Sequence, residues 1–244
     1  MSGSPRRRIP PKIRAIVTDV DGTLTDADRV LNAEAVRLIQ SIQRAEIPVI
    51  IATGNVLPIA LALHRSIGLT APIVAENGGL IYTREHGRDR VERCADRAVA
   101  YRAFRAVRAA GLPARRLFTD RWRETEVALE QNMSVRSIES VVDRTQVRVE
   151  ATGYAIHLMQ RGCGKLPSIR RVLARIGLTP SDCLIAGDGD NDAPMLRAAG
   201  WGVSFPNASA RARAAAHYVS RSSYAKGFSE GLIRSGVVGR SANG

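Results

Sequence analysis

The feature that most constrains the fold is a pair of acidic turns, each of which directly follows a short, mostly apolar segment. Residues 19–23 (DVDGT) follow the segment 15–18, and residues 187–192 (GDGDND) follow the segment 183–186. Such segments are typical of strands that are buried on both faces of a parallel sheet. Because parallel strands share one carboxyl-terminal edge, we expect both acidic turns to lie together at that edge.

Strand and helix signals alternate on both sides of these turns. Further strands are predicted at residues 47–52, 72–75 and 202–205. Helices are predicted after Asn32, from Pro58 to about residue 69, from Lys165 to residue 176, and from Asp192, Ser209 and Ala225. This alternation predicts an α/β fold with a doubly wound (Rossmann-like) parallel-sheet core.

The middle of the chain has a different order of signals. A helix, two strands, a second helix and two more strands are predicted at residues 96–110, 116–119, 125–129, 138–144, 147–152 and 154–160. This order is typical of a small α+β unit with an antiparallel sheet. We therefore predict a core formed by residues 13–82 and 161–244, an inserted α+β cap at 83–160, and a disordered basic tail at 1–12.

The composition excludes several classes of protein. Hydrophobic residues make up 45% of the chain, which excludes global disorder, and no apolar run is long enough to span a bilayer. No apolar signal segment follows the basic N-terminus, so we expect a cytoplasmic location. The three cysteines and four histidines are scattered, without the spacing of a disulfide framework or a zinc site. Nothing in the sequence indicates an oligomeric state.

The net charge of +13 is a value that nucleic-acid-binding proteins often have. Only three of the 36 basic residues are lysine, however, which indicates a general preference for arginine rather than one basic patch. Arg6, Arg7, Arg8, Lys12 and Arg14 supply +5 of the charge in a segment without acidic residues. We therefore do not expect a nucleic-acid partner, although a basic nucleic-acid-binding protein is kept as the distant alternative.

The two acidic turns predict one metal site. Asp19 and Asp21 stand two residues apart, and Asp188 and Asp192 would reach the same sheet edge. Carboxylates packed this closely repel each other unless a cation is present, and oxygen ligands suit Mg²⁺. A calcium loop is the alternative, but the twelfth position counted from Asp19 is Val30 rather than an acid.

Two further features are weak when taken alone. Thr53, Gly54 and Asn55 precede a predicted helix, where main-chain N–H groups favour anions, but a threonine in this place is usually only a cap. Lys165 is one of few lysines and begins another predicted helix, where it would offer a compact positive charge.

Taken together and in this order, these motifs resemble those of the haloacid dehalogenase-like phosphatases. The matching motifs are residues 19–23, Thr53, Lys165 and residues 187–192, and the inserted middle unit resembles the type-II cap of that family. The stretches 19–26, 53–56, 77–80, 121–124 and 153–160 are most similar to the archaeal phosphoglycolate phosphatase group. Asp190, an extra acid in a variable position, and the basic tail depart from the family pattern.

The resemblance implies a phosphatase that acts on a small phosphorylated metabolite with Mg²⁺ as cofactor. Asp19 would attack phosphorus and form an aspartyl-phosphate. Asp21 would protonate the leaving group and then activate water. Asp19, Asp188 and the main-chain carbonyl of Asp21 would hold the Mg²⁺ ion, with Asp192 in support.

The phosphate oxygens would be held by Thr53, with its neighbours Gly54 and Asn55, and by Lys165. For 2-phosphoglycolate, the cap would have to bind the carboxylate, and Arg121 and Arg123 are the residues we expect to do so. If residues 121–123 form a strand or turn, both side chains would face the core; surface positions are the alternative.

Other substrates and reactions stay open. Sugar phosphates and mannosyl-phosphoglycerate are alternative substrates for the same hydrolytic core. A phosphomutase or phosphotransferase would transfer the phosphoryl group to a hydroxyl instead of water.

Overall fold

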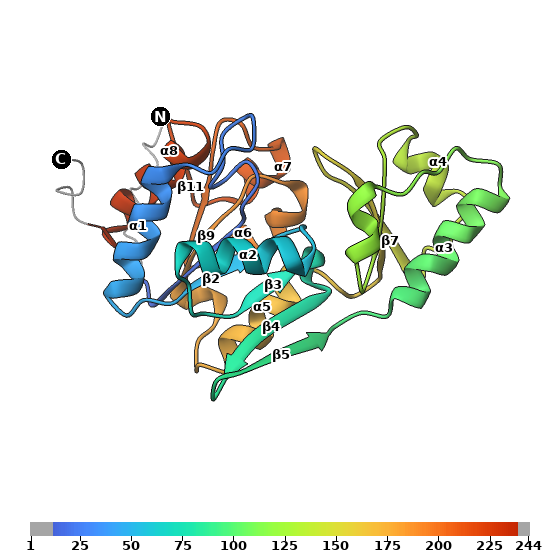
Figure 1. Ribbon diagram of the computed structural model, residues 1–244. Helices are drawn as coiled ribbons and strands as arrows, with labels where there is room; N and C mark the ends of the chain where they lie inside the picture. The colour runs from blue at the N-terminus through green and yellow to red at the C-terminus, as the bar shows by residue number, and fades with distance from the viewer. Residues whose placement is uncertain (1–11, 239–244) are drawn as a thin grey trace.

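The computed structural model describes residues 12–238, so the predicted tail, apart from Lys12, lies outside the described residues. The core contains one eight-stranded sheet with the order β11-β10-β9-β1-β2-β3-β4-β5 (Figure 1). Its strands are β1 (Ala15–Thr18), β2 (Val49–Ala52), β3 (Ile73–Ala75), β4 (Leu80–Glu85), β5 (Arg88–Arg93), β9 (Cys183–Ala186), β10 (Trp201–Ser204) and β11 (Tyr218–Val219). All neighbours from β11 to β3 pair in parallel, which confirms the predicted doubly wound core.

Helices cover both faces of this sheet. One apolar cluster joins Ile16, Ile51 and Leu184 to helices α1 (Ala33–Arg44), α2 (Leu57–Ile67) and α8 (Tyr224–Ser235). A second cluster joins Val17 and Ile185 to α5 (Lys165–Ala174), α6 (Ala193–Ala198) and α7 (Ala210–Ala215). The central strands are therefore buried on both sides, as their continuous apolar sequences require.

Local signals in the sequence explain where the helices begin and end. The side chain of Asn32 accepts the N–H groups of Glu34 and Ala35, so it caps α1 as predicted. Pro58 lies in the first turn of α2, where a missing N–H has no cost. Gly68 ends the same helix at φ = 82°, a conformation that favours glycine.

The β4–β5 hairpin extends the large sheet beyond the boundary expected from sequence. β4 pairs antiparallel with β3 and with β5, so hydrogen bonds continue the core sheet to Arg93. The expected division between residues 82 and 83 falls inside β4. We therefore propose that the chain passes from core to cap near residue 94.

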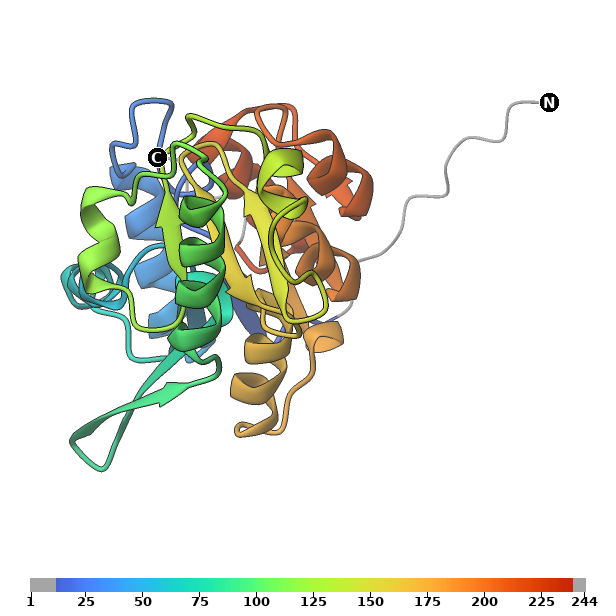
Figure 2. The same ribbon diagram turned by 90° about the vertical axis from the view of Figure 1, so that its right-hand side faces the viewer.

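The cap contains a separate three-stranded antiparallel sheet with the order β6-β8-β7. In Figure 2 the cap lies in front of the core. It consists of α3 (Arg97–Ala109), β6 (Val127–Leu129), α4 (Val135–Glu139), β7 (Val147–Ala151) and β8 (Ile156–Gln160). Its own apolar cluster, which includes Ala103, Val107 and Leu158, joins α3 to the sheet. The inserted α+β architecture thus agrees with the sequence.

The predicted strand at residues 116–119 is wrong. Arg116 makes only an isolated bridge to Leu129, and a 3₁₀ turn follows at Phe118–Trp122. The buried carboxylate of Asp120 accepts the N–H of Ala128 at 2.8 Å. This side chain takes the donor that a continuing strand would otherwise have paired, so the chain turns instead.

Among residues 12–238, no helix combines the length and apolar character needed to cross a membrane.

Candidate active site

Asp19, Thr53 and the second acidic turn, which were predicted from the sequence, lie together with Glu76 at the carboxyl-terminal edge of four adjacent strands. Asp19 follows β1, Thr53 follows β2, Glu76 follows β3 and Gly187 follows β9. The parallel pairing of Thr18 with Ala186 places the two acidic turns side by side. The expected meeting of these turns is therefore explained by strand order alone.

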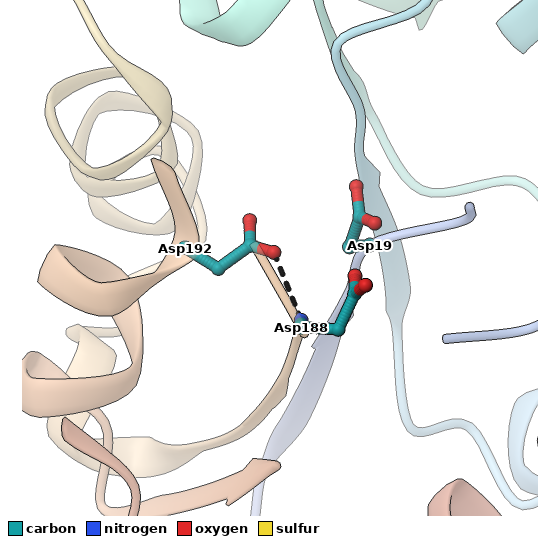
Figure 3. A group of neighbouring side chains, drawn as sticks. All are labelled: Asp19, Asp188 and Asp192. Carbon is teal, nitrogen blue, oxygen red and sulfur yellow. Dashed lines mark hydrogen bonds between the residues drawn. The ribbon is translucent and has the colours of Figure 1, made fainter. Parts of the chain in front are cut away.

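Asp19, Asp188 and Asp192 form one cluster of carboxylates (Figure 3). One oxygen from each lies within 4.8 Å of the others. Gly22 packs against this cluster at φ = 76°, and a Cβ on it would lie 2.2 Å from Asp188 Oδ2. Glycine at position 22 therefore satisfies both the turn conformation and the close approach to the carboxylate.

Lys165, the first residue of α5, bridges two of these carboxylates. Its Nζ donates to Asp19 Oδ1 and to Asp192 Oδ1, both at 2.7 Å, and its side chain is almost fully buried. Burial would lower the pKa of Lys165, but Asp19 and Asp192 outweigh burial and raise it. The lysine is thus a permanent positive charge in the site.

Asp192 also fixes the second acidic turn. Its Oδ2 accepts the main-chain N–H groups of Asp188 at 3.0 Å and Gly189 at 2.9 Å. Both oxygens of Asp192 are therefore engaged by the protein, which suits a supporting residue better than a direct metal ligand.

Burial and mutual repulsion make the remaining acids costly to ionise. Burial, followed by Asp192, raises the pKa of Asp188 to about 7, although Lys165 opposes the shift. Burial also raises the pKa of Asp19 well above its usual value, with Lys165 acting against it and Asp192 and Asp188 acting with it. A group of carboxylates with one lysine has excess negative charge, so its chemistry fits a divalent cation held by oxygen.

Asp21 and the segment that begins with Thr53 are held together. Asn55 Nδ2 donates to Asp21 Oδ2 at 2.7 Å, and the N–H of Asn55 donates to the hydroxyl of Thr53 at 3.0 Å. Asp21, Gly54 and Asn55 line a cavity of about 230 Å³ together with Asp19 and Asp188. Thr53 and Lys165 are buried behind this cavity wall rather than on it.

The structure separates Arg121 from Arg123. Arg123 is buried and lines the cavity, whereas Arg121 is exposed and stacks on Phe118 and Trp122. The expectation that both face the core is wrong because residue 121 lies in the 3₁₀ turn, while residue 123 follows it in extended conformation. Alternation along a strand therefore does not apply here.

Sequence reasoning missed a polar network between core and cap. Asn77 Nδ2 donates to Glu126 Oε2 at 3.2 Å, and Glu126 Oε1 lies 3.0 Å from His157 Nδ1. Asn77 also accepts from Asn191 Nδ2 at 2.9 Å. All but Asn191 are nearly fully buried, and His157 lines the cavity.

Glu76 of the core forms a second set of contacts with the cap that the sequence did not predict. Its carboxylate accepts the N–H groups of Glu124 and Thr125 and the Thr125 hydroxyl, at 2.6 to 3.1 Å. Glu76 and Asn77 have φ values of 49° and 53°, a region that non-glycine residues rarely adopt. The sequence offered one signal for this region. Residues 77–80 contributed to the family resemblance, but no function was predicted for them.

Comparison with known proteins identifies the family. Residues 16–121 and 129–232 match the haloacid dehalogenase-like hydrolases. A phosphoglycolate phosphatase of Methanothermobacter thermautotrophicus is 33% identical over 222 residues, which cover 91% of this chain and 98% of the relative. A phosphoglycolate phosphatase of Methanopyrus kandleri is 35% identical over 197 residues, 79% of this chain and 84% of the relative.

Solved structures agree with this assignment. A Thermoplasma acidophilum protein superposes with a TM-score of 0.82 at 25% identity and covers 93% of this chain and all of its own. A sugar phosphatase of haloacid dehalogenase subclass IIB has a TM-score of 0.73 at 17% identity, covering 92% of this chain and 100% of its own. The resemblance inferred from the motifs is confirmed, and the chain belongs to the haloacid dehalogenase-like hydrolases with a subclass IIB cap.

Proposed function

We propose that this protein is a Mg²⁺-dependent phosphatase that hydrolyses 2-phosphoglycolate to glycolate and phosphate through an aspartyl-phosphate on Asp19. The observation that carries the proposal is the position of Asp19. Its carboxylate is buried, it faces Asp188 and Asp192, and it accepts a hydrogen bond from Lys165. A nucleophile in this setting is desolvated and fixed in direction.

The donor set fits a hard divalent cation. Asp19 and Asp188 would hold Mg²⁺ with the main-chain carbonyl of Asp21, and Asp192 would support the turn between them. The ion would offset the charge of the phosphate, so that an anionic carboxylate can approach an anionic ester.

In the first half-reaction, an Asp19 carboxylate oxygen forms a bond to phosphorus while the bond to the ester oxygen breaks. Asp21 donates its proton to the departing alkoxide, which leaves as the alcohol. The hydrogen bond from Asn55 Nδ2 to Asp21 Oδ2 orients this acid toward the cavity. In the second half-reaction, Asp21 takes a proton from water, whose oxygen attacks phosphorus and releases phosphate and free Asp19.

The positive charge of Lys165, the hydroxyl of Thr53 and the N–H of Gly54 would stabilise the phosphoryl oxygens as charge shifts during transfer. Lys165 already donates a hydrogen bond to Asp19, so its positive charge would lie next to both the nucleophile and the phosphoryl group.

Two observations support a small acidic substrate. The curated relatives named above are phosphoglycolate phosphatases and are aligned over most of the chain. The cavity has a volume of about 230 Å³ and is lined on the cap side by Arg123, Tyr154 and His157, which suits a short phosphate ester.

A screen of phosphate release tests this proposal. Purified protein with Mg²⁺ would be assayed against 2-phosphoglycolate, hexose phosphates, mannosyl-phosphoglycerate and p-nitrophenyl phosphate. We expect the highest kcat/KM for 2-phosphoglycolate. Release that needs an added sugar acceptor would instead identify a mutase or phosphotransferase.

A further inference from the structure

Arg123 is a buried cation with part of its hydrogen-bonding capacity unused. The residue is only 4% exposed, and it lines the cavity that also contains Asp19. Its hydrogen bonds to Gly54 and to Glu126 are both donated by Nη1. Its Nε is buried and has no partner among residues 12–238. A buried donor without a partner is costly, which makes this edge of the guanidinium a site for an anion.

The surrounding residues hold Arg123 in one position. Glu126 pairs with Arg123, with His157 and with Asn77 of the core. Burial would raise the pKa of Glu126, but His157 and Arg123 outweigh burial and lower it to about 2. Glu126 is therefore ionised, and it neutralises the guanidinium through Nη1, while Nε makes no hydrogen bond among the described residues.

The position of Arg123 limits the length of any ligand that reaches it. Arg123 Nη1 donates to the carbonyl of Gly54 at 3.0 Å. Gly54 belongs to the segment that would bind the phosphate. A substrate group that contacts Arg123 must therefore lie within a few bonds of the phosphorus.

We propose that the Nε edge of Arg123 binds a carboxylate that is one carbon away from the phosphate ester oxygen, and that Glu126 positions Arg123 for this contact. This inference rests on the proposed phosphatase function and names its substrate class: short phosphate monoesters of 2-hydroxy acids. A guanidinium suits this task because its planar N–H edge can bind both carboxylate oxygens at once.

One other cation could do the same. Arg29 also lines the cavity, and its guanidinium lies 4.1 Å from the centre of the Tyr154 ring. Arg29 is exposed to solvent, so a carboxylate would gain less from it than from a buried guanidinium. The inference therefore assigns recognition to Arg123 and not to Arg29.

The test compares 2-phosphoglycolate with ethyl phosphate, which has the same length but carries a methyl group in place of the carboxylate. The ratio of the two kcat/KM values would be measured for wild type and for Arg123→Met, Arg29→Met and Arg121→Met. We expect Arg123→Met to lower this ratio at least about tenfold, mainly through KM for 2-phosphoglycolate. Arg121→Met is the matched control and should leave the ratio within about twofold.

A binding measurement separates recognition from turnover. Calorimetric titration of 2-phosphoglycolate into Asp19→Asn and into the double variant Asp19→Asn/Arg123→Met should show at least about tenfold weaker binding in the double variant. Glu126→Gln should also weaken this binding, whereas Glu126→Asp should restore part of it if Glu126 positions Arg123.

The outcomes distinguish this inference from the proposed function. A wild-type enzyme that shows no preference for 2-phosphoglycolate over ethyl phosphate would contradict the proposed substrate. A wild-type preference that survives Arg123→Met, or that is lost in Arg29→Met instead, would overturn the role of Arg123 alone. Equal losses on both esters in Arg123→Met would show a structural role and would also overturn it.

Discussion

Lys165 Nζ lies 2.7 Å from Asp19 Oδ1, and this buried ion pair joins residues that are 146 positions apart in the sequence. The same ammonium group contacts Asp192 at 2.7 Å. The two halves of the core, which the cap separates along the chain, are therefore joined at the candidate catalytic centre by one side chain.

Removing the charge of Lys165 should destabilise the protein. In Lys165→Met, Asp19 and Asp192 would remain buried without their cation, which costs about 3–5 kcal/mol. Because the folded pKa of Lys165 is raised, its contribution is fully present at pH 7 and is lost only as pH rises above the usual lysine range. Urea unfolding at pH 7 in chelator measures the loss, with the exposed Lys226→Met as control. A loss below about 1 kcal/mol would contradict this role.

Glu126→Gln should reduce stability in a pH-dependent way. Lowering the pKa of Glu126 from 4.5 to about 2 corresponds to about 3 kcal/mol of stabilisation. For a carboxyl group with a depressed pKa, this stabilisation is present above pH 4.5 and is lost as pH falls toward 2. The difference in unfolding free energy between wild type and Glu126→Gln should therefore be largest at neutral pH. The exposed Glu46→Gln should show no such trend, and a pH-independent difference would count against the ionised Glu126.

The conformation and packing of Gly22 predict a separate effect on the metal site. Gly22→Ala adds a Cβ at φ = 76° that would lie 2.2 Å from Asp188 Oδ2, so the carboxylate has to move. Gly68→Ala is a matched control, because its φ is 82° and a Cβ there would meet nothing within 4 Å. Both variants should lose about 1 kcal/mol from the strained φ, but only Gly22→Ala should weaken Mg²⁺ binding. Equal Mg²⁺ affinities by calorimetry would show that Gly22 does not shape the site.

How much the sequence predicts depends on the range of the interactions involved. The alternation of strands and helices is a local pattern that predicts a parallel sheet, so the meeting of Asp19 with Asp188 at one sheet edge could be predicted. The capping of α1 by Asn32 was visible for the same reason. The strand predicted at residues 116–119 is wrong because the buried Asp120 carboxylate accepts the N–H of Ala128, which a continuing strand would have paired.

The cap residues that line the site could not be predicted, because they come together through long-range contacts. Glu126 and His157 come together only through the pairing of β6 with β8, and Asn77 reaches them only because the cap closes on the core. No spacing in the sequence records such contacts. The burial of Arg123 could not be predicted either. It depends on the 3₁₀ turn at Phe118–Trp122, which contains Arg121 and ends just before Arg123.

Activity should depend on Mg²⁺. Chelator should abolish phosphate release, and added Mg²⁺ should restore it, because the carboxylates of Asp19 and Asp188 otherwise repel the phosphate. Calcium should inhibit, since its larger and looser coordination shell misplaces the nucleophile relative to phosphorus. Full activity in chelator would contradict a metal site in this cluster.

The most direct test of the central claim is phosphate release from 2-phosphoglycolate by wild type and by Asp19→Asn, with Mg²⁺ present and with folding of both proteins checked by circular dichroism. An amide cannot attack phosphorus at a useful rate, so Asp19→Asn should retain less than about 1% of wild-type kcat while keeping the fold. Wild-type protein should also give a phosphorylated Asp19 in acid-quenched samples analysed by mass spectrometry. Substantial turnover by Asp19→Asn, or no release of phosphate by wild type, would contradict covalent catalysis by Asp19 on this substrate.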